Sequence, residues 1–99
     1  MLPNHTKRLL ASTLCLGFGV RTTTRPDIAI QAKMAGYQWL FLDQEHTQLS
    51  LDCISATCLL ACHVGITPIV RVNGPHSIPR TLDCGAQGYY YEFSFIVLL

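Results

Sequence analysis

Short apolar runs alternate with segments of helical periodicity along most of this 99-residue chain. The four residues 39–42, Trp-Leu-Phe-Leu, are continuously apolar, which is typical of a strand buried on both faces in a parallel sheet covered by helices. Similar runs occupy 14–20 and 66–72, where Pro68 is expected to limit pairing near the start, and "QGYYY" at 87–91 resembles the start of a fourth strand. The pattern predicts strand and helix alternating three times, followed by one more strand.

The segments between these runs carry helix-start and helix-stop signals. A first helix is predicted over 26–35, with Thr24 or Arg25 before it and a stop at Gly36. Ser50 is a candidate N-cap for a second helix that ends at Gly65. Ser77 is the matching cap for a short third helix, which carries Pro79 in its first turn and ends at Gly85. Short connections between such elements imply right-handed parallel crossovers.

Length and composition narrow the class of protein. The chain is 49% apolar and 13% charged, as expected for one small globular domain. A net charge of +1 provides no basic patch for nucleic acid. The longest nearly apolar run, 89–99, is interrupted by Glu92 and is about half the length that crosses a bilayer. We therefore expect a cytoplasmic protein without a nucleic-acid or membrane partner.

Five cysteines and no recognisable signal peptide favour a reducing compartment with free thiols, because an odd number cannot all pair within the chain. A zinc site built from Cys58, Cys62 and the neighbouring His63 is one alternative. However, this spacing lacks the closely spaced cysteine pairs of structural zinc modules. The other interpretation is that these cysteines are small buried apolar residues.

Charged side chains follow the predicted strands at the point where each ends. In parallel α/β proteins the functional loops follow the carboxyl ends of the strands. Asp43, Glu45 and His46 follow the second strand, Arg71 closes the third, and Arg21 follows the first. An imidazole titrates near neutral pH and suits acid–base catalysis, whereas a guanidinium fork suits a carboxylate or an enolate. The pattern predicts an anion-binding or carbonyl-chemistry site.

Simpler interpretations exist for the same residues. The tetrapeptide "DQEH" can supply turn and cap chemistry alone, and an arginine at a strand end is often solvated. Asp83 lies late in the third predicted helix, where the helix dipole disfavours a carboxylate. It is either an exposed residue at a frayed helix end or a partner of His46 or Arg71.

Three motifs in this order, "AGYQWLFLDQEH", "GITPIVRV" and "IPRTLDCGAQG", resemble the HpcH/HpaI aldolase family. The family includes 2-keto-3-deoxy sugar-acid and 4-hydroxy-2-oxoheptanedioate aldolases. Each motif alone is weak, but the three at these separations are quite specific. The similarity extends over residues 7–88.

This resemblance implies a TIM barrel that cleaves a 2-keto-3-deoxy or 4-hydroxy-2-oxo acid to pyruvate and an aldehyde with a divalent metal, Mg²⁺ or Mn²⁺. It implies that Arg71 binds the pyruvyl group, that His46 is the general acid/base, and that Asp83 works with that histidine. Glu45 and Asp43 would lie in the surroundings of the metal. A fixed guanidinium and a metal both stabilise charge that develops on an enolate oxygen.

The chain also departs from the family pattern. A complete barrel of this type needs about 250 residues, so we expect the amino-terminal half of a TIM (β/α)₈ barrel, in a single partial domain over 1–99. The segment 89–99 looks unrelated to the family, as in a truncated or misread coding sequence. The metal ligands of the family follow later strands, so we expect no metal ligand and no bound metal here. A full-length relative would form a homo-oligomer.

Open sheet edges and an open inner face invite association, and we expect the isolated chain to lack full catalytic activity. Two other hypotheses remain open. The chain is either a non-catalytic remnant that acts as an interaction module, or a complete small open α/β domain that binds an anion.

Overall fold

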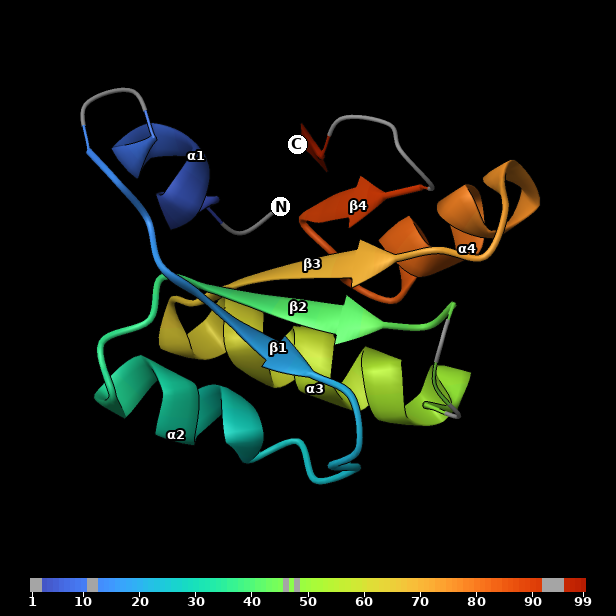
Figure 1. Ribbon diagram of the computed structural model, residues 1–99, viewed down its shortest axis with the longest axis horizontal. Coiled ribbons are helices and arrows are strands. Elements are labelled where there is room, and N and C mark those ends of the chain that lie inside the picture. The colour runs from blue at the N-terminus through green and yellow to red at the C-terminus, as the bar shows by residue number, and fades with distance from the viewer. Residues whose placement is uncertain (1–2, 11–12, 46, 48, 92–95) are drawn as a thin grey trace.

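The computed structural model describes residues 3–10, 13–45, 47, 49–91 and 96–99. A short helix precedes the sheet, and strands and helices then alternate (Figure 1). In chain order the elements are α1 (His5–Leu9), β1 (Gly17–Val20), α2 (Ile28–Met34), β2 (Trp39–Asp43), α3 (Leu51–Val64), β3 (Thr67–Arg71), the 3₁₀ turn η1 (Pro75–Ser77), α4 (Ile78–Asp83), β4 (Gly88–Tyr90) and β5 (Val97–Leu98).

The sheet has the strand order β1-β2-β3-β4-β5. The first four strands are parallel, each paired with the next strand along the chain, and β5 is antiparallel to β4. This order confirms the predicted fold class of three strand–helix units followed by a fourth parallel strand. The antiparallel strand β5 was not predicted.

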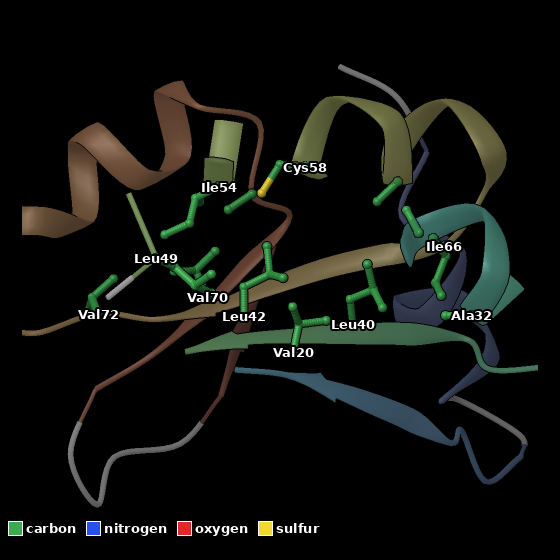
Figure 2. Close-up of a cluster of buried hydrophobic side chains, with 13 residues drawn as sticks. Val20, Ala32, Leu40, Leu42, Leu49, Ile54, Cys58, Ile66, Val70 and Val72 are labelled. Atoms are coloured by element: carbon green, nitrogen blue, oxygen red, sulfur yellow. The ribbon is translucent and has the colours of Figure 1, made fainter. Parts of the chain in front are cut away.

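The core lies between the sheet and helices α2 and α3, which cover the same face of the sheet (Figure 1). Alternate residues of β2 and β3 point into it, and Leu40 and Val70 have no exposed surface. Figure 2 shows Leu42 and Val70 on the side of the sheet that faces Ile54 and Cys58 of α3. Ile78 and Leu82 of α4 pack against the same cluster. One continuous core therefore joins the helices to the sheet.

Two of the predicted helix boundaries are confirmed in detail. The Ser50 hydroxyl accepts a hydrogen bond from the Cys53 amide at 3.1 Å and begins α3. Gly65 ends α3 in the left-handed conformation, with φ of 86°. The predicted stops at Gly36 and Gly85 also hold, since each follows the C-cap of its helix with positive φ, 98° and 106°. The N-caps of these two helices differ from the prediction. Asp27, rather than Thr24 or Arg25, precedes α2, and Ser77 closes η1 without capping α4.

Pro68 lies inside β3, between β2 and β4. Its carbonyl accepts a hydrogen bond from Gln87 N at 2.9 Å, which places its backbone groups toward β4. The β3–β4 pairing begins only at the next residue, where Ile69 is opposite Gly88. The missing N–H of the proline therefore falls where β4 has not yet begun. The expected limit on pairing applies to the β4 side of β3, and the pairing with β2 is kept.

Helix α1, which no sequence pattern predicted, lies against the amino ends of the strands (Figure 1). The Thr6 hydroxyl donates to the Gln38 carbonyl at 2.8 Å, and the Thr6 amide donates to the Thr67 hydroxyl at 3.3 Å. Asn4 Nδ2 donates to the carbonyls of Gln87 and Leu99. These contacts join the start of the chain to the beginnings of β3 and β4.

In the described part of the chain, no helix is long and apolar enough to span a membrane.

The buried packing of Leu40 predicts a large stability loss on truncation. Leu40→Ala should lower the free energy of unfolding by about 2–5 kcal/mol, since it removes a side chain from a filled core. The matched control Met34→Ala, at a side chain that is 83% exposed, should change it by less than about 0.5 kcal/mol. Urea unfolding followed by circular dichroism measures both, and equal losses would contradict the assignment of the core.

Cys58 predicts a loss of stability at alkaline pH. Burial, with a smaller contribution from the neighbouring thiols, raises the pKa of Cys58 well above its usual value. The unfolded thiol ionises near pH ~8.5 while the folded one stays protonated, so stability is fully present below that pH and declines above it. Unfolding free energies measured from pH 7 to 10 should therefore fall more steeply for the native chain than for Cys58→Ala. Parallel slopes would contradict this account.

Candidate functional site

The parallel register of β2 and β3 places Asp43 directly opposite Arg71, and Arg71 opposite Tyr90 of β4. All three residues lie at or beside the carboxyl ends of their strands. Because side chains alternate along a strand, Asp43 and Arg71 face away from the core side chains Leu42 and Val70. The predicted charged residues therefore lie together at the carboxyl ends of the strands, on the face of the sheet opposite the helices, which we call the inner face.

Asp43 and Arg71 form a bidentate ion pair at this edge. Arg71 Nε donates to Asp43 Oδ1 at 3.1 Å, and Arg71 Nη2 donates to Asp43 Oδ2. The Asp43 side chain is 1% exposed and that of Arg71 is 24% exposed. The hydrogen bond that Arg71 donates to Asp43 raises the pKa of Arg71 above its usual value. Partial burial opposes this shift, and the negative charges of Asp43 and Glu45 support it. Arg71 therefore carries a permanent charge held in one orientation.

Two more charged side chains predicted from the sequence approach this pair. Glu45 Oε1 lies 3.9 Å from Arg71 Nε, and Arg21 Nε lies 3.8 Å from Asp43 Oδ2. The Arg21 side chain is 64% exposed, so its contribution is strongly screened. Four of the predicted residues thus gather at one edge with alternating charge.

Asp43 also shapes the loop that follows it. The Glu45 amide donates to Asp43 Oδ1 at 3.1 Å, and the Thr47 hydroxyl donates to the Asp43 carbonyl. The Gln44 amide donates to the Arg71 carbonyl at 3.1 Å and continues the β2–β3 pairing by one residue. The turn chemistry considered from the sequence is therefore real, and it coexists with the ion pair.

Aromatic side chains beside Arg71 were not among the predicted site residues. The Arg71 guanidinium lies 5.4 Å from the Phe41 ring centroid, a cation–π distance. Phe41 packs in turn against Tyr90, with centroids 6.1 Å apart. Two features of the sequence could have indicated these residues. Phe41 alternates with the core residues of β2, and Tyr90 lies at the end of the fourth apolar run.

His46, the predicted acid/base, lies outside the described residues. Asp83 is an exposed residue at the last position of α4. After α4 the chain reaches Gln87, whose backbone amide donates to the Pro68 carbonyl near the start of β3. Arg71 lies at the opposite end of that strand. The structure therefore does not bring Asp83 to Arg71, and the helix-end interpretation of this residue accounts for its position.

The metal alternatives were tested on the described residues. Among them, no three His, Cys, Asp or Glu side chains gather into a group that could hold a metal ion. His63 Nδ1 contacts the Leu59 carbonyl at 2.8 Å, and Cys62 Sγ donates to the Gly85 carbonyl at 3.3 Å. The zinc alternative at Cys58, Cys62 and His63 therefore has no support from the described part of the chain.

The burial of Asp43 predicts a strong coupling with Arg71. Arg71→Met should lower the free energy of unfolding by about 3 kcal/mol, because it leaves a dry carboxylate without its main partner. The double variant Asp43→Asn with Arg71→Met should recover most of this loss, since neither side chain is then charged. Arg25→Met is the control, because its pair with Asp27 is exposed and should contribute less than about 1 kcal/mol. Additive losses in the double variant would contradict the coupling.

No protein-family model matches this chain. The 4-hydroxy-4-methyl-2-oxoglutarate aldolase tasA of Hapsidospora irregularis is 40% identical over 81 residues, which are 79% of this chain and 30% of the aldolase. The 4-hydroxy-4-methyl-2-oxoglutarate aldolase cghB of Chaetomium globosum is 36% identical over 91 residues, 89% of this chain and 34% of that protein.

One of the matching solved structures carries the name of this family. An HpcH/HpaI aldolase from Desulfitobacterium hafniense superposes with a TM-score of 0.78 and 26% identity, over 86% of this chain and 34% of the aldolase chain. The chain thus spans about a third of the length of the proteins that it matches. By motif, sequence and partial-barrel fold, this chain belongs to the HpcH/HpaI aldolase family.

Proposed function

We propose that the edge formed by Asp43, Arg71 and Glu45 is the 2-oxo-acid-binding part of an aldolase active site. The observation that supports this best is the bidentate pair between Asp43 and Arg71. A guanidinium has five N–H donors, of which Asp43 uses two. Arg71 Nη1 has no partner in the described part of the chain, so these donors remain for a ligand.

The relatives named above suggest the substrate class. In 4-hydroxy-4-methyl-2-oxoglutarate, the bond between C3 and C4 is β to the 2-oxo group. Breaking it after loss of the 4-hydroxyl proton leaves the enolate of pyruvate and a second pyruvate, and protonation at C3 completes the reaction. We propose a reaction of this type, on a 4-hydroxy-2-oxo acid, as the chemistry to which these residues contribute.

Each residue has a separate part in this proposal. Arg71 binds the carboxylate and the oxygen of the 2-oxo group and stabilises the negative charge that develops on the enolate. Asp43 holds the guanidinium in place, which reduces the rearrangement needed when the charge appears. His46 takes the hydroxyl proton and returns a proton to C3. The partnership of Asp83 with His46 stays a prediction, as do the cytoplasmic location and a homo-oligomer in longer relatives.

A divalent metal, when bound, would add Lewis-acid stabilisation of the same enolate oxygen. The described carboxylates do not fit this role alone, because Asp43 directs both oxygens to Arg71 and only Glu45 remains nearby. No step assigned to this chain therefore passes through a metal, and full cleavage is expected to need groups beyond those described.

The enolisation step can be tested without the complete reaction. Exchange of the pyruvate methyl protons for deuterium, followed by proton NMR, should run faster with the chain than in buffer at the same pH. Arg71→Lys keeps the charge but loses the fork, and should slow the catalysed exchange by about 100-fold, in the range lost when one oxyanion donor is removed.

Arg25→Lys is the matched control, since this exposed arginine lies outside the site, and it should leave the exchange rate unchanged. Circular dichroism verifies that both variants fold. Exchange no faster than in buffer, or equal rates for Arg71→Lys and the native chain, would reject the proposed role.

A further inference from the structure

A second guanidinium, that of Arg21, lies at the same edge of the sheet and has no part in the enolate chemistry proposed above. The last residue of β1, Val20, is opposite Leu42 of β2, and the next residues along the two strands are Arg21 and Asp43. Asp43 is in turn opposite Arg71 of β3. The three strands lie side by side in Figure 1, so one carboxylate lies in a row between two guanidinium groups.

The two arginines hold this carboxylate unequally. Arg71 donates one hydrogen bond to each oxygen of Asp43, whereas Arg21 Nε lies 3.8 Å from Oδ2, beyond hydrogen-bond distance. The Arg21 side chain is 64% exposed, and in the described part of the chain it donates no hydrogen bond. Its N–H groups therefore remain available to a ligand that reaches this edge.

The other exposed arginine near the end of β1 is used differently. Arg25 donates to both oxygens of Asp27, from Nε at 3.3 Å and from Nη2 at 3.2 Å. Its fork is therefore occupied by a carboxylate of the chain itself. The contrast identifies Arg21 as the arginine after β1 that can bind an external anion, and it makes Arg25 a matched control.

Open space lies beside Arg21 on the inner face. Side chains alternate along β1, so Gly19 is on the inner face when Val20 points into the core. A Cβ atom built on Gly19 would have no other atom within 4 Å, and Gly19 is directly opposite Phe41. A small carbon chain can therefore lie over this glycine, beside the Phe41 ring and next to both guanidinium groups.

The arrangement of charge favours a ligand with two carboxylates. Arg71 compensates Asp43, and Glu45 lies on the Arg71 side of the row, 3.9 Å from its Nε. A monocarboxylate bound to Arg71 leaves the donors of Arg21 unused. Because both guanidinium groups lie next to Asp43, their separation suits the two ends of one small molecule. A dicarboxylate supplies each arginine with its own partner.

We propose that Arg21 binds the second carboxylate of a dicarboxylic 4-hydroxy-2-oxo acid, while Arg71 holds the first carboxylate and the 2-oxo group. This inference rests on the proposed function, to which it adds the class of substrate. The second carboxylate is attached at C4 and leaves with the carbonyl product, which is then itself a 2-oxo acid. Arg21 thus selects the substrate and has no part in forming the enolate.

Binding of two unreactive acids tests this assignment on the full chain. The acids 2-oxoglutarate and 2-oxopentanoate share a five-carbon chain and a 2-oxo group, and differ in a terminal carboxylate in place of a methyl group. Neither has a 4-hydroxyl, so neither can be cleaved. Isothermal titration calorimetry should show that 2-oxoglutarate binds about ten-fold more tightly, as expected for one charge-assisted hydrogen bond.

Substitutions locate the source of this preference. Arg21→Gln should lower the affinity for 2-oxoglutarate to that for 2-oxopentanoate and leave the affinity for 2-oxopentanoate unchanged. Arg25→Gln removes an equal charge nearby and should preserve the preference. Circular dichroism verifies that both variants fold. Equal affinities of the native chain for the two acids, or a preserved preference in Arg21→Gln, would overturn the inference and leave the role of Arg71 intact.

A further variant distinguishes this failure from failure of the proposed function. Arg71→Lys should weaken the binding of both acids by a similar factor, since both present the same carboxylate and 2-oxo group to Arg71. Unchanged affinity for both acids in Arg71→Lys would reject the proposed function itself. If the native chain bound neither acid, both the proposed function and the role of Arg21 would be rejected.

Discussion

The pairing of Asp43 with Arg71 across β2 and β3 is the interaction on which the edge of this sheet depends. It needs the observed register, because a slip of one residue would turn one of the two side chains toward the apolar core. A buried carboxylate without a partner is costly, so the pair favours that register over its neighbours. The Asp43 carboxylate also accepts a hydrogen bond from the Glu45 amide, and the Asp43 backbone carbonyl accepts one from the Thr47 hydroxyl. One side chain thus orders both the strand ends and the loop after β2.

Alternation along β2 divides the chemistry of the two faces. Leu40 and Leu42 fill the core, while Phe41 and Asp43 face the inner side with Arg71. Beyond the strand, Gln44 lines a cavity together with residues of the loop after β3 and of α4. Adjacent residues of one strand therefore serve different purposes, since one face fills the core and the other holds a fixed cation. A substitution on one face can leave the side chains of the other in place.

Local signals predicted local structure well. Ser50 and Gly65 act within a few residues, and α3 begins and ends where they indicate. Arg71 was predictable because an arginine after Ile69 and Val70 has no role in a buried strand. Helix α1 and strand β5 depend on contacts distant in sequence, such as the bond from Asn4 to Gln87, 83 residues apart, and no local pattern reports them. The role of Asp83 beside His46, which was taken from the motif, stays a prediction. Its place at the last position of α4 depends on the course of the chain between β3 and β4, which the motif itself does not report.

Hydration of the Arg71 edge sets how strongly it can act on a ligand. Asp43 is nearly dry, at 1% exposure, whereas Arg71 is 24% exposed, so water reaches the guanidinium on the side away from the carboxylate. A charge interaction weakens several-fold between a dry site and a wet one. Phe41 already excludes water from one face of the guanidinium. A ligand that covers the remaining side would strengthen its own bond to Arg71, so affinity and electrostatic stabilisation should rise together as that side is covered.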